Sequence, residues 1–187
     1  TCAPPDFYQA VDALAQEAPP GANGLIFMPW LYGERTPIDD RLIRGGFVNL
    51  SLSANRAHIC RAVLEGVAYN AGWLLSAVEK FASRKFSVIR VIGGGAGSDI
   101  WCGIHADVLN RRIAKVKDPP LANVRGAGLL GTVALGFLEF DEIQGLVETE
   151  RTYDPDPANR EVYDRMFKEF RAAYKRNRKI CARLNRT

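Results

Sequence analysis

The chain of 187 residues is poor in the residues that build metal centres and disulfide frameworks, with 4 cysteines and 2 histidines. Cys2, Cys60, Cys102 and Cys181 stand far apart, with no C-x-x-C pair and no histidine at metal-ligand spacing. This pattern predicts neither a zinc site nor a disulfide framework, and it is typical of reduced cytoplasmic thiols. We expect no metal site on the protein itself.

Long apolar runs are also missing, because charged residues interrupt each of them, and no basic-then-apolar leader opens the chain. We therefore expect a cytoplasmic protein with no membrane partner. The first residue is Thr rather than Met, and an amphipathic segment follows almost at once, which indicates a piece of a longer polypeptide.

Charge of one sign is not in large excess: 25 Lys and Arg face 21 Asp and Glu, for a net charge of +4. The basic excess lies near the C-terminus, where a helix is expected over 157–185. No aromatic-rich module for reading bases accompanies it, so nucleic acid is not expected as a partner, and an anionic small ligand fits the charge as well. The 47% hydrophobic composition predicts one globular domain over 1–187.

Hydrophobic periodicity and turn residues predict strands that alternate with helices. Helices are expected over 6–18 (with Asp6 as cap), 54–82 (after Ser51 or Ser53), 99–110 (after Ser98), 123–136 and 158–184, and strands over 24–29, 88–93 and 112–116. The segment 29–50 is expected to be irregular, and a loop of that length is usually functional. The β-α-β-α order predicts an α/β layer.

Three consecutive glycines, Gly93, Gly94 and Gly95, end a predicted strand and lead to the helix that Ser98 caps. Bare backbone at a helix N-terminus favours an anion or nucleotide, since no side chain holds the ligand away. An equally good interpretation is a turn that only lets the helix pack closely on the sheet.

A dinucleotide-binding oxidoreductase fragment is a further alternative for the same glycines. The pattern Gly93-x-Gly95-x-x-Ser98, with Asp118 beyond the next strand, differs from the dinucleotide fingerprint at its sixth position, where Ser replaces Gly or Ala. No His or Tyr set for hydride transfer can be named downstream, which disfavours this alternative.

Three collinear segments, PWLYGERTP (29–37), GGFVNLSLSANRAHICRAVLEG (45–66) and GGGAGSDIWCGIHADVLN (93–110), stand between Gly24 and Gly136. Together they resemble the C-terminal domain of the FGGY carbohydrate kinases, the family of xylulokinase, gluconokinase, ribulokinase and glycerol kinase. The second segment is similar to the family signature of a glycine, an aromatic, a leucine, His-apolar-x-x-Ala and Leu-Glu. The GERTP loop is most similar to xylulokinase.

This resemblance implies an α/β, ribonuclease-H-like fold of the actin, hexokinase and Hsp70 type, with a central mixed sheet and flanking helices. It implies that the chain is the C-terminal half of a two-domain kinase and binds ATP or ADP, with Mg²⁺ held through the nucleotide. The reaction implied is transfer of the γ-phosphoryl group of ATP to a hydroxyl of a sugar or polyol, with a xylulose-like sugar expected first.

No segment here matches the N-terminal half, which in the family supplies the sugar pocket, much of the phosphate loop and the aspartate base. We therefore expect no catalytic residue in this chain. The alternative is a non-catalytic nucleotide-binding or assembly module whose basic last helix docks a partner. A homodimer is one of the partner states that we consider.

Carried over position by position, the resemblance implies that Gly94, Gly95 and Ala96 form the floor under adenine and ribose, with Gly93 allowing the close approach. The other ATP-binding positions that it implies are Ser98 and Asp99 beside the base, and Gly126 and Gly128 at the start of a helix that closes on the nucleotide. Tight helix packing is an equal alternative for the last two. Asn49 departs from the family, which usually has glycine there.

Five residues outside these positions are also candidates. We expect Trp101 to pack its helix against the sheet rather than to stack on a base. Glu34 and Arg35 are expected to pair with each other and so to pin the long loop, with a reach toward the cleft as the alternative. His58 and His105 have no carboxylate or Ser at catalytic spacing, which predicts core or surface roles for both.

Overall fold

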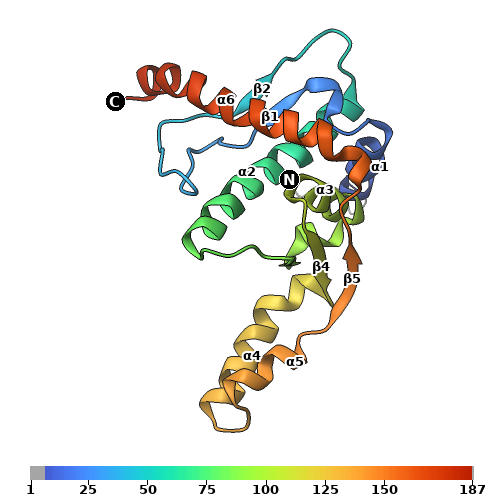
Figure 1. Cartoon of the computed structure of the whole chain (residues 1–187), viewed down its shortest axis with the longest axis vertical. Helices are drawn as coiled ribbons and strands as arrows, with labels where there is room; N and C mark the ends of the chain where they lie inside the picture. Colours follow the sequence, from blue (N-terminus) through green and yellow to red (C-terminus); the bar gives the residue numbers. More distant parts are fainter. Residues whose placement is uncertain (1–6, 187) are drawn as a thin grey trace.

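Alternating helices and strands make up most of residues 7–186, the part of the chain that the computed structural model describes (Figure 1). The helices are α1 (Phe7–Glu17), α2 (Arg56–Phe81), α3 (Asp99–Leu109), α4 (Ala122–Ala134), α5 (Ile143–Leu146) and α6 (Arg160–Asn185). The strands are β1 (Ile26–Met28), β2 (Gly46–Val48), β3 (Val88–Val91), β4 (Arg112–Val116) and β5 (Thr149–Tyr153). The predicted cap at Asp6 and the thiol of Cys2 lie outside the described residues.

The strands form two sheets. β1 and β2 pair antiparallel, and the second sheet has the order β3-β4-β5, in which β4 runs parallel to β3 and antiparallel to β5. Helix α3 connects β3 to β4 and packs on β4, while α2 packs on α3. The predicted β-α-β-α order and the mixed sheet are therefore confirmed.

Two strands were not anticipated from the sequence pattern. The side chains of β5 are mostly exposed, so its sequence, TERTY, shows no apolar alternation, and backbone pairing with β4 makes it a strand. The three residues of β2 lie in the segment expected to be irregular and are held by β1. Such short strands depend on their neighbours rather than on their own propensity.

The cap of α2 also differs from the prediction. Asn55 is the N-cap, and its side chain accepts from the His58 backbone N–H at 3.1 Å while His58 Nδ1 accepts from the Asn55 N–H. Ser51 and Ser53 do not cap the helix but hydrogen-bond each other at 2.7 Å. Because Asn55 is the cap, the helix begins at Arg56. His58 thus has the structural role expected of it.

Aromatic side chains from α2, from α6 and from the segment just after β1 fill the main core. Trp30, Tyr69, Tyr163 and Phe170 are almost completely buried, and the ring centroids of Trp30 and Phe170 lie 5.0 Å apart. Trp30 Nε1 donates to Asn70 Oδ1 at 3.0 Å, which satisfies the polar atom of the indole. Truncating such a ring to Ala costs about 3–5 kcal/mol.

A buried ion pair joins α1, α2 and α6 beside this core. Arg61 Nε lies 2.8 Å from Glu65 Oε1, its Nη1 donates to the carbonyls of Ala15 and Ala18 near the end of α1, and its Nη2 donates to the Tyr163 hydroxyl. Glu65 also accepts from the Tyr163 hydroxyl at 2.9 Å. Burial raises the pKa of Glu65, against the lowering effect of the Arg61 charge.

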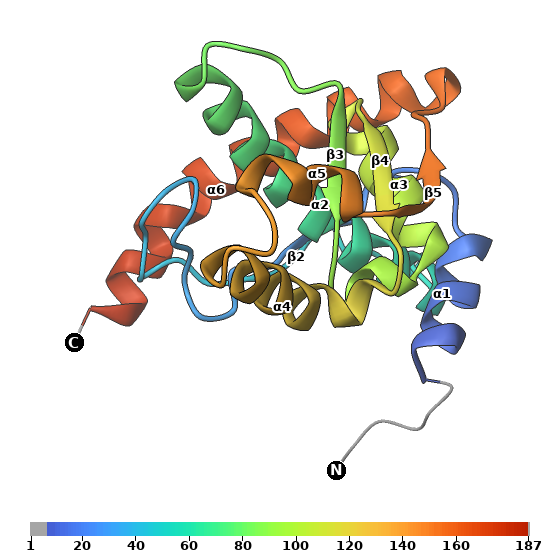
Figure 2. The same cartoon turned by 90° about the horizontal axis from the view of Figure 1, so that it is seen from below.

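Helices α4 and α5 project from the end of the β3-β4-β5 sheet and lie nearest the viewer when the molecule is seen from below (Figures 1 and 2). None of the residues of α4 is buried. We call residues 122–146 the arm; its exposed apolar side chains are Val124, Leu130, Leu135, Phe137, Phe140 and Leu146. Between residues 7 and 186, no helix combines the length and the apolar character needed to cross a membrane.

Candidate functional site

The glycine turn, which we define as residues 93–98, connects the end of β3 to the start of α3. Gly93 has φ 84° and ψ −179°, a conformation in which side chains other than that of glycine are strained. Its N–H donates to the Pro119 carbonyl at 2.8 Å, which ties the glycine turn to the segment before α4. The backbone conformation therefore requires glycine at position 93.

The neighbouring glycines have different surroundings. A Cβ placed on Gly94 or Gly97 meets nothing within 4 Å, whereas one placed on Gly95 lies 2.4 Å from Cζ3 of Trp101. The side chain of Ala96 is buried, and its carbonyl accepts from the Cys102 thiol at 3.7 Å. Open space beside the backbone and close packing thus occur in the same turn, at different residues.

Ser98 caps α3 as predicted: its Oγ accepts from the Trp101 backbone N–H at 3.1 Å. Asp99 is held by its own chain, because its carboxylate accepts from the Tyr153 hydroxyl at 2.5 Å and from Arg151 at 2.6 Å. These partners, together with Lys115, lower the pKa of Asp99, with the Tyr153 hydrogen bond first. A contact between Asp99 and a base stays a prediction.

Gly126 and Gly128 lie two residues apart on α4, which places them roughly 200° apart around the helix. Gly126 lines a cavity of about 390 Å³, and Gly128 is not among its lining residues. A Cβ on either meets nothing within 4 Å beyond the helix itself, so tight packing does not explain these glycines within residues 7–186. Only Gly126 faces a cavity that continues toward the glycine turn.

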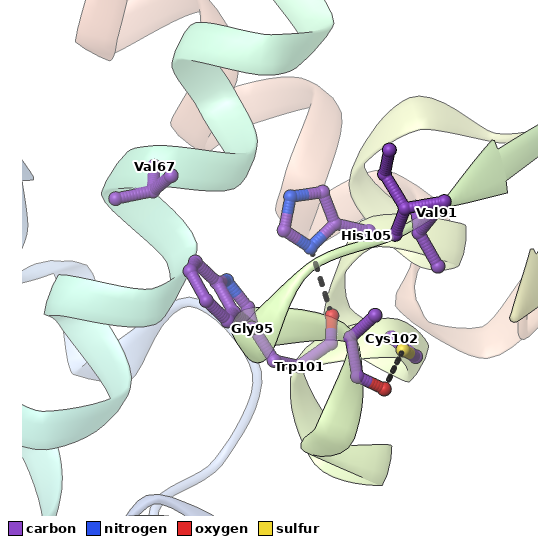
Figure 3. A pocket seen from close by; sticks show the side chains of 8 residues that line it. Val67, Val91, Gly95, Trp101, Cys102 and His105 are labelled. Carbon is purple, nitrogen blue, oxygen red and sulfur yellow. Dashed lines mark hydrogen bonds between the residues drawn. The ribbon is translucent and has the colours of Figure 1, made fainter. Parts of the chain in front are cut away.

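Two cavities meet at Ile92, just before the glycine turn. The first, of about 300 Å³, is lined by Val67 of α2, Gly95, Trp101 and His105 (Figure 3). The second is the 390 Å³ cavity between the sheet and the arm. Both fall near the lower end of the size range of small-molecule sites, about 300–1,000 Å³.

The titratable side chains of the first cavity are not set up as nucleophile or base. Nδ1 of His105 lies 2.9 Å from the Trp101 carbonyl (Figure 3), and burial lowers the pKa of the imidazole. Burial also raises the pKa of Cys102 to about 11, so the thiol is protonated at neutral pH. Both residues belong to the packing of α3, as expected for His105.

The predicted pairing of Glu34 with Arg35 is wrong. Glu34 Oε1 accepts from the backbone N–H groups of Arg35 and Thr36, and its Oε2 accepts from Asn70 Nδ2 at 2.8 Å. Amide donors surround the carboxylate on both sides, so no guanidinium is needed to satisfy it. The loop is pinned, but it is pinned to its own turn and to α2.

Asn49 has φ 64°, in the left-handed region that favours glycine and that Asn tolerates better than most residues. Its side chain donates to the Gly24 carbonyl at 3.2 Å. The position therefore keeps the backbone conformation that a glycine would adopt.

The contact between Gly95 and Trp101 was missed from the sequence. Helical side chains lean toward the N-terminus of their helix, and Trp101 stands three residues after the cap Ser98. That spacing was the available signal that the indole reaches back to the glycine turn.

A family model described as "FGGY family of carbohydrate kinases, C-terminal domain" matches residues 5–135. The chain belongs to this family. The interpretation of the glycine pattern as an oxidoreductase fingerprint is replaced by this membership.

Among FGGY relatives, the chain is 31% identical over 179 residues to the xylulose kinase of Staphylococcus epidermidis strain RP62A, covering 95% of the chain and 36% of that protein. It is 30% identical over 178 residues to the xylulose kinase of Bacillus subtilis, covering 93% and 35%. The chain thus spans about a third of the length of these curated relatives.

Solved FGGY structures share the fold. The ligand-bound xylulose kinase of Lactobacillus acidophilus superposes with a TM-score of 0.82 at 30% identity, over 90% of this chain and 34% of that one. The glycerol kinase of Plasmodium falciparum with ADP has a TM-score of 0.73 at 19% identity, over 90% and 33%. The predicted actin and hexokinase type of fold is confirmed.

Proposed function

We propose that this chain is the adenine-nucleotide-binding C-terminal domain of an ATP-dependent carbohydrate kinase, and that residues 1–187 form one domain. In the complete enzyme, a γ-phosphoryl group passes from ATP to a hydroxyl of a sugar or polyol. The relatives named xylulose kinase make a xylulose-like sugar the first choice of acceptor. A cytoplasmic location belongs to the same proposal.

One observation carries the nucleotide assignment: the backbone of Gly94 and Gly97 faces open space in the turn that connects β3 to the capped N-terminus of α3. Ligands of open α/β sheets bind outside the carboxyl ends of parallel strands, and β3 and β4 are such a pair. A flat purine and its ribose can approach bare backbone there without meeting a side chain.

In this proposal the chain binds and orients the nucleoside, and a partner half supplies the acceptor pocket and the base. Phosphoryl transfer depends mainly on positioning and on stabilisation of charge, so correct placement of the nucleotide is itself a catalytic contribution. Residues 7–186 bring together no group of three or more His, Cys, Asp or Glu side chains suited to a metal ion. Mg²⁺ enters the proposal as the ion that accompanies the nucleotide phosphates.

Calorimetric titration with ADP and ATP tests the proposal on the natural chain, on Gly94→Val and on the matched control Gly103→Val. Both substitutions add a side chain where a Cβ meets nothing within 4 Å, and neither glycine has positive φ. We expect Gly94→Val to weaken nucleotide binding about tenfold or more, a loss of about 1.4 kcal/mol, and Gly103→Val to bind like the natural chain. Equal binding by both variants, or no binding by the natural chain, would contradict the proposal.

The second candidate function is a non-catalytic assembly module. The exposed apolar side chains of the arm favour it, since Leu130 is 60%, Phe137 75% and Phe140 69% exposed. A homodimer is one form that such an assembly takes. Self-association in sedimentation velocity, without any heat on nucleotide titration, would support this candidate over the kinase domain.

A further inference from the structure

The indole of Trp101 lies against the inner side of the glycine turn, directly below Gly95. A Cβ on Gly95 would lie 2.4 Å from Cζ3, 3.0 Å from Cε3 and 3.3 Å from Cη2 of that ring. Three atoms of the six-membered ring therefore occupy the place that any side chain at position 95 would take. Gly95 itself is exposed, so its other side faces solvent.

Helix α2 and helix α3 hold the indole in this place. Trp101 Nε1 donates to the Leu64 carbonyl of α2 at 3.0 Å, and the ring lies 5.3 Å from the His105 ring, one turn further along α3. Figure 3 shows the indole between the glycine turn and Val67 of α2. Because the Nε1 end is anchored, the ring is not free to swing away.

The glycine turn is the softer of the two surfaces in contact. It carries three exposed glycines, Gly94, Gly95 and Gly97, and its tie to the rest of the chain at Gly93 is one N–H bond to Pro119. We therefore expect a side chain added at position 95 to displace the glycine turn rather than the indole.

We propose that Trp101 is a positioning residue for the adenine nucleoside: it supports the glycine turn from below and so sets the height of the exposed backbone on which purine and ribose rest. This inference rests on the proposed nucleotide site. It assigns to Trp101 an effect on the nucleoside part of the ligand, so affinity for adenosine, ADP and ATP changes by the same factor. It also explains why the glycine turn has glycine at position 95, where no positive φ demands one.

Three variants test the inference: the single substitutions Gly95→Ala and Trp101→Leu, and the double variant that carries both. Leu lacks the ring atoms that meet the Gly95 Cβ, so the double has room for the added methyl group. We expect Gly95→Ala to weaken ADP and adenosine binding about tenfold, and Trp101→Leu several-fold, because the support is removed. In the double variant we expect the affinity to recover to within about threefold of that of the natural chain. If the two substitutions acted independently, their losses of affinity would multiply.

Amide hydrogen exchange without nucleotide gives a second readout. Protection of the Gly93 N–H, which donates to Pro119, is expected to fall in Gly95→Ala and to return in the double. Trp101→Met, with a flexible side chain that adapts to gaps, replaces Trp101→Leu if thermal melting shows that the Leu variant is unfolded.

The outcomes separate the positioning role of Trp101 from the proposed nucleotide site. Unchanged Gly93 protection and unchanged affinity in Gly95→Ala overturn the role of Trp101, and so does a double that binds no better than Gly95→Ala. Loss of affinity for ADP but not for adenosine overturns the nucleoside assignment. If Gly93 protection follows the expected pattern while no protein, the natural chain included, binds nucleotide, the proposed function fails and Trp101 has a packing role alone.

Discussion

At the scale of single residues, the ion pair between Arg61 and Glu65 shows how a charged side chain is kept in a core. Glu65 is completely buried, and its carboxylate accepts from Arg61, from the Gly21 N–H and from the Tyr163 hydroxyl. A buried pair of this kind contributes little net stability compared with apolar residues, but loss of one partner leaves an uncompensated charge.

We predict that Arg61→Met destabilises the chain by about 3–5 kcal/mol at pH 7. The loss is smaller at low pH. Burial raises the pKa of Glu65 above its ordinary 4.5, so the folded state binds the proton more tightly than the unfolded state. The variant therefore loses stability as the pH rises above 4.5 and is most stable below it.

Urea unfolding of the natural chain and Arg61→Met at several pH values between 4 and 8 measures this difference. Arg112→Met is the control, since Arg112 pairs with Asp154 on the surface, where an ion pair contributes about 0–1 kcal/mol. Equal losses for the two variants would contradict the prediction.

Three neighbouring glycines show that identical residues can have different physical roles. Gly93 serves a backbone conformation, Gly94 leaves space open, and Gly95 makes room for an indole. Glycine is therefore present at three consecutive positions for three different physical reasons. Only the surroundings of each residue distinguish them.

At the scale of secondary-structure elements, the end of α2 is fastened to the segment that leads into β3. Glu79 accepts from Lys85, from the Phe86 N–H and from Arg111, which follows α3. Burial opposes ionisation of this carboxyl, but these hydrogen bonds prevail and lower the pKa of Glu79 to about 2. The connection fixes how α2 and α3, which hold Trp101 between them, meet β3.

Helix α4 supplies the element-scale prediction. Glycine inside a helix is less stable than Ala by about 0.8–1.0 kcal/mol, so Gly126→Ala and Gly128→Ala each stabilise the arm. Only Gly126 lines the cavity next to the glycine turn. We expect Gly126→Ala to weaken ADP binding several-fold and Gly128→Ala to leave it unchanged.

Thermal melting and calorimetric titration of the two variants separate these effects, because both gain stability and one loses affinity. Equal affinities would remove α4 from the nucleotide site. A loss of affinity in Gly128→Ala alone would place the ligand on the opposite side of the helix.

At the scale of the whole molecule, the proposed nucleotide binding is linked to the stability of the fold. A ligand that binds the folded chain at about 100 times its Kd adds about 2.7 kcal/mol to the free energy of unfolding. For a domain of this size that raises the melting temperature by on the order of 5–10 °C. At the same ADP concentration we expect this shift in the natural chain and about half of it or less in Gly94→Val, because its binding is about tenfold weaker or more.

Differential scanning calorimetry measures both melting temperatures, with Gly103→Val as the control that keeps the shift. An equal shift in Gly94→Val would place the nucleotide away from the glycine turn.

Much of the architecture was predictable, because long helices and buried strands carry their own periodicity. The three-turn span of α3 with its Ser98 cap follows from local rules, and so does the strand before the three glycines. β5 was not predictable, since its exposed side chains have no pattern and β4 alone makes it a strand. The hydrogen bond between Glu34 and Asn70 was not predictable either, because Asn70 is 36 residues away in the chain.

The sequence by itself determined the α/β order, the capped glycine turn and the three motifs of the FGGY family, since each depends on residues close together in the chain. Tertiary structure alone decided which glycines face open space and which face another part of the protein. The reason is that the Trp101 indole occupies the space beside Gly95. The position of that indole is set in turn by its hydrogen bond to the Leu64 carbonyl on α2, 37 residues earlier. Space around a backbone atom is a property of everything packed near it, and no local pattern encodes it.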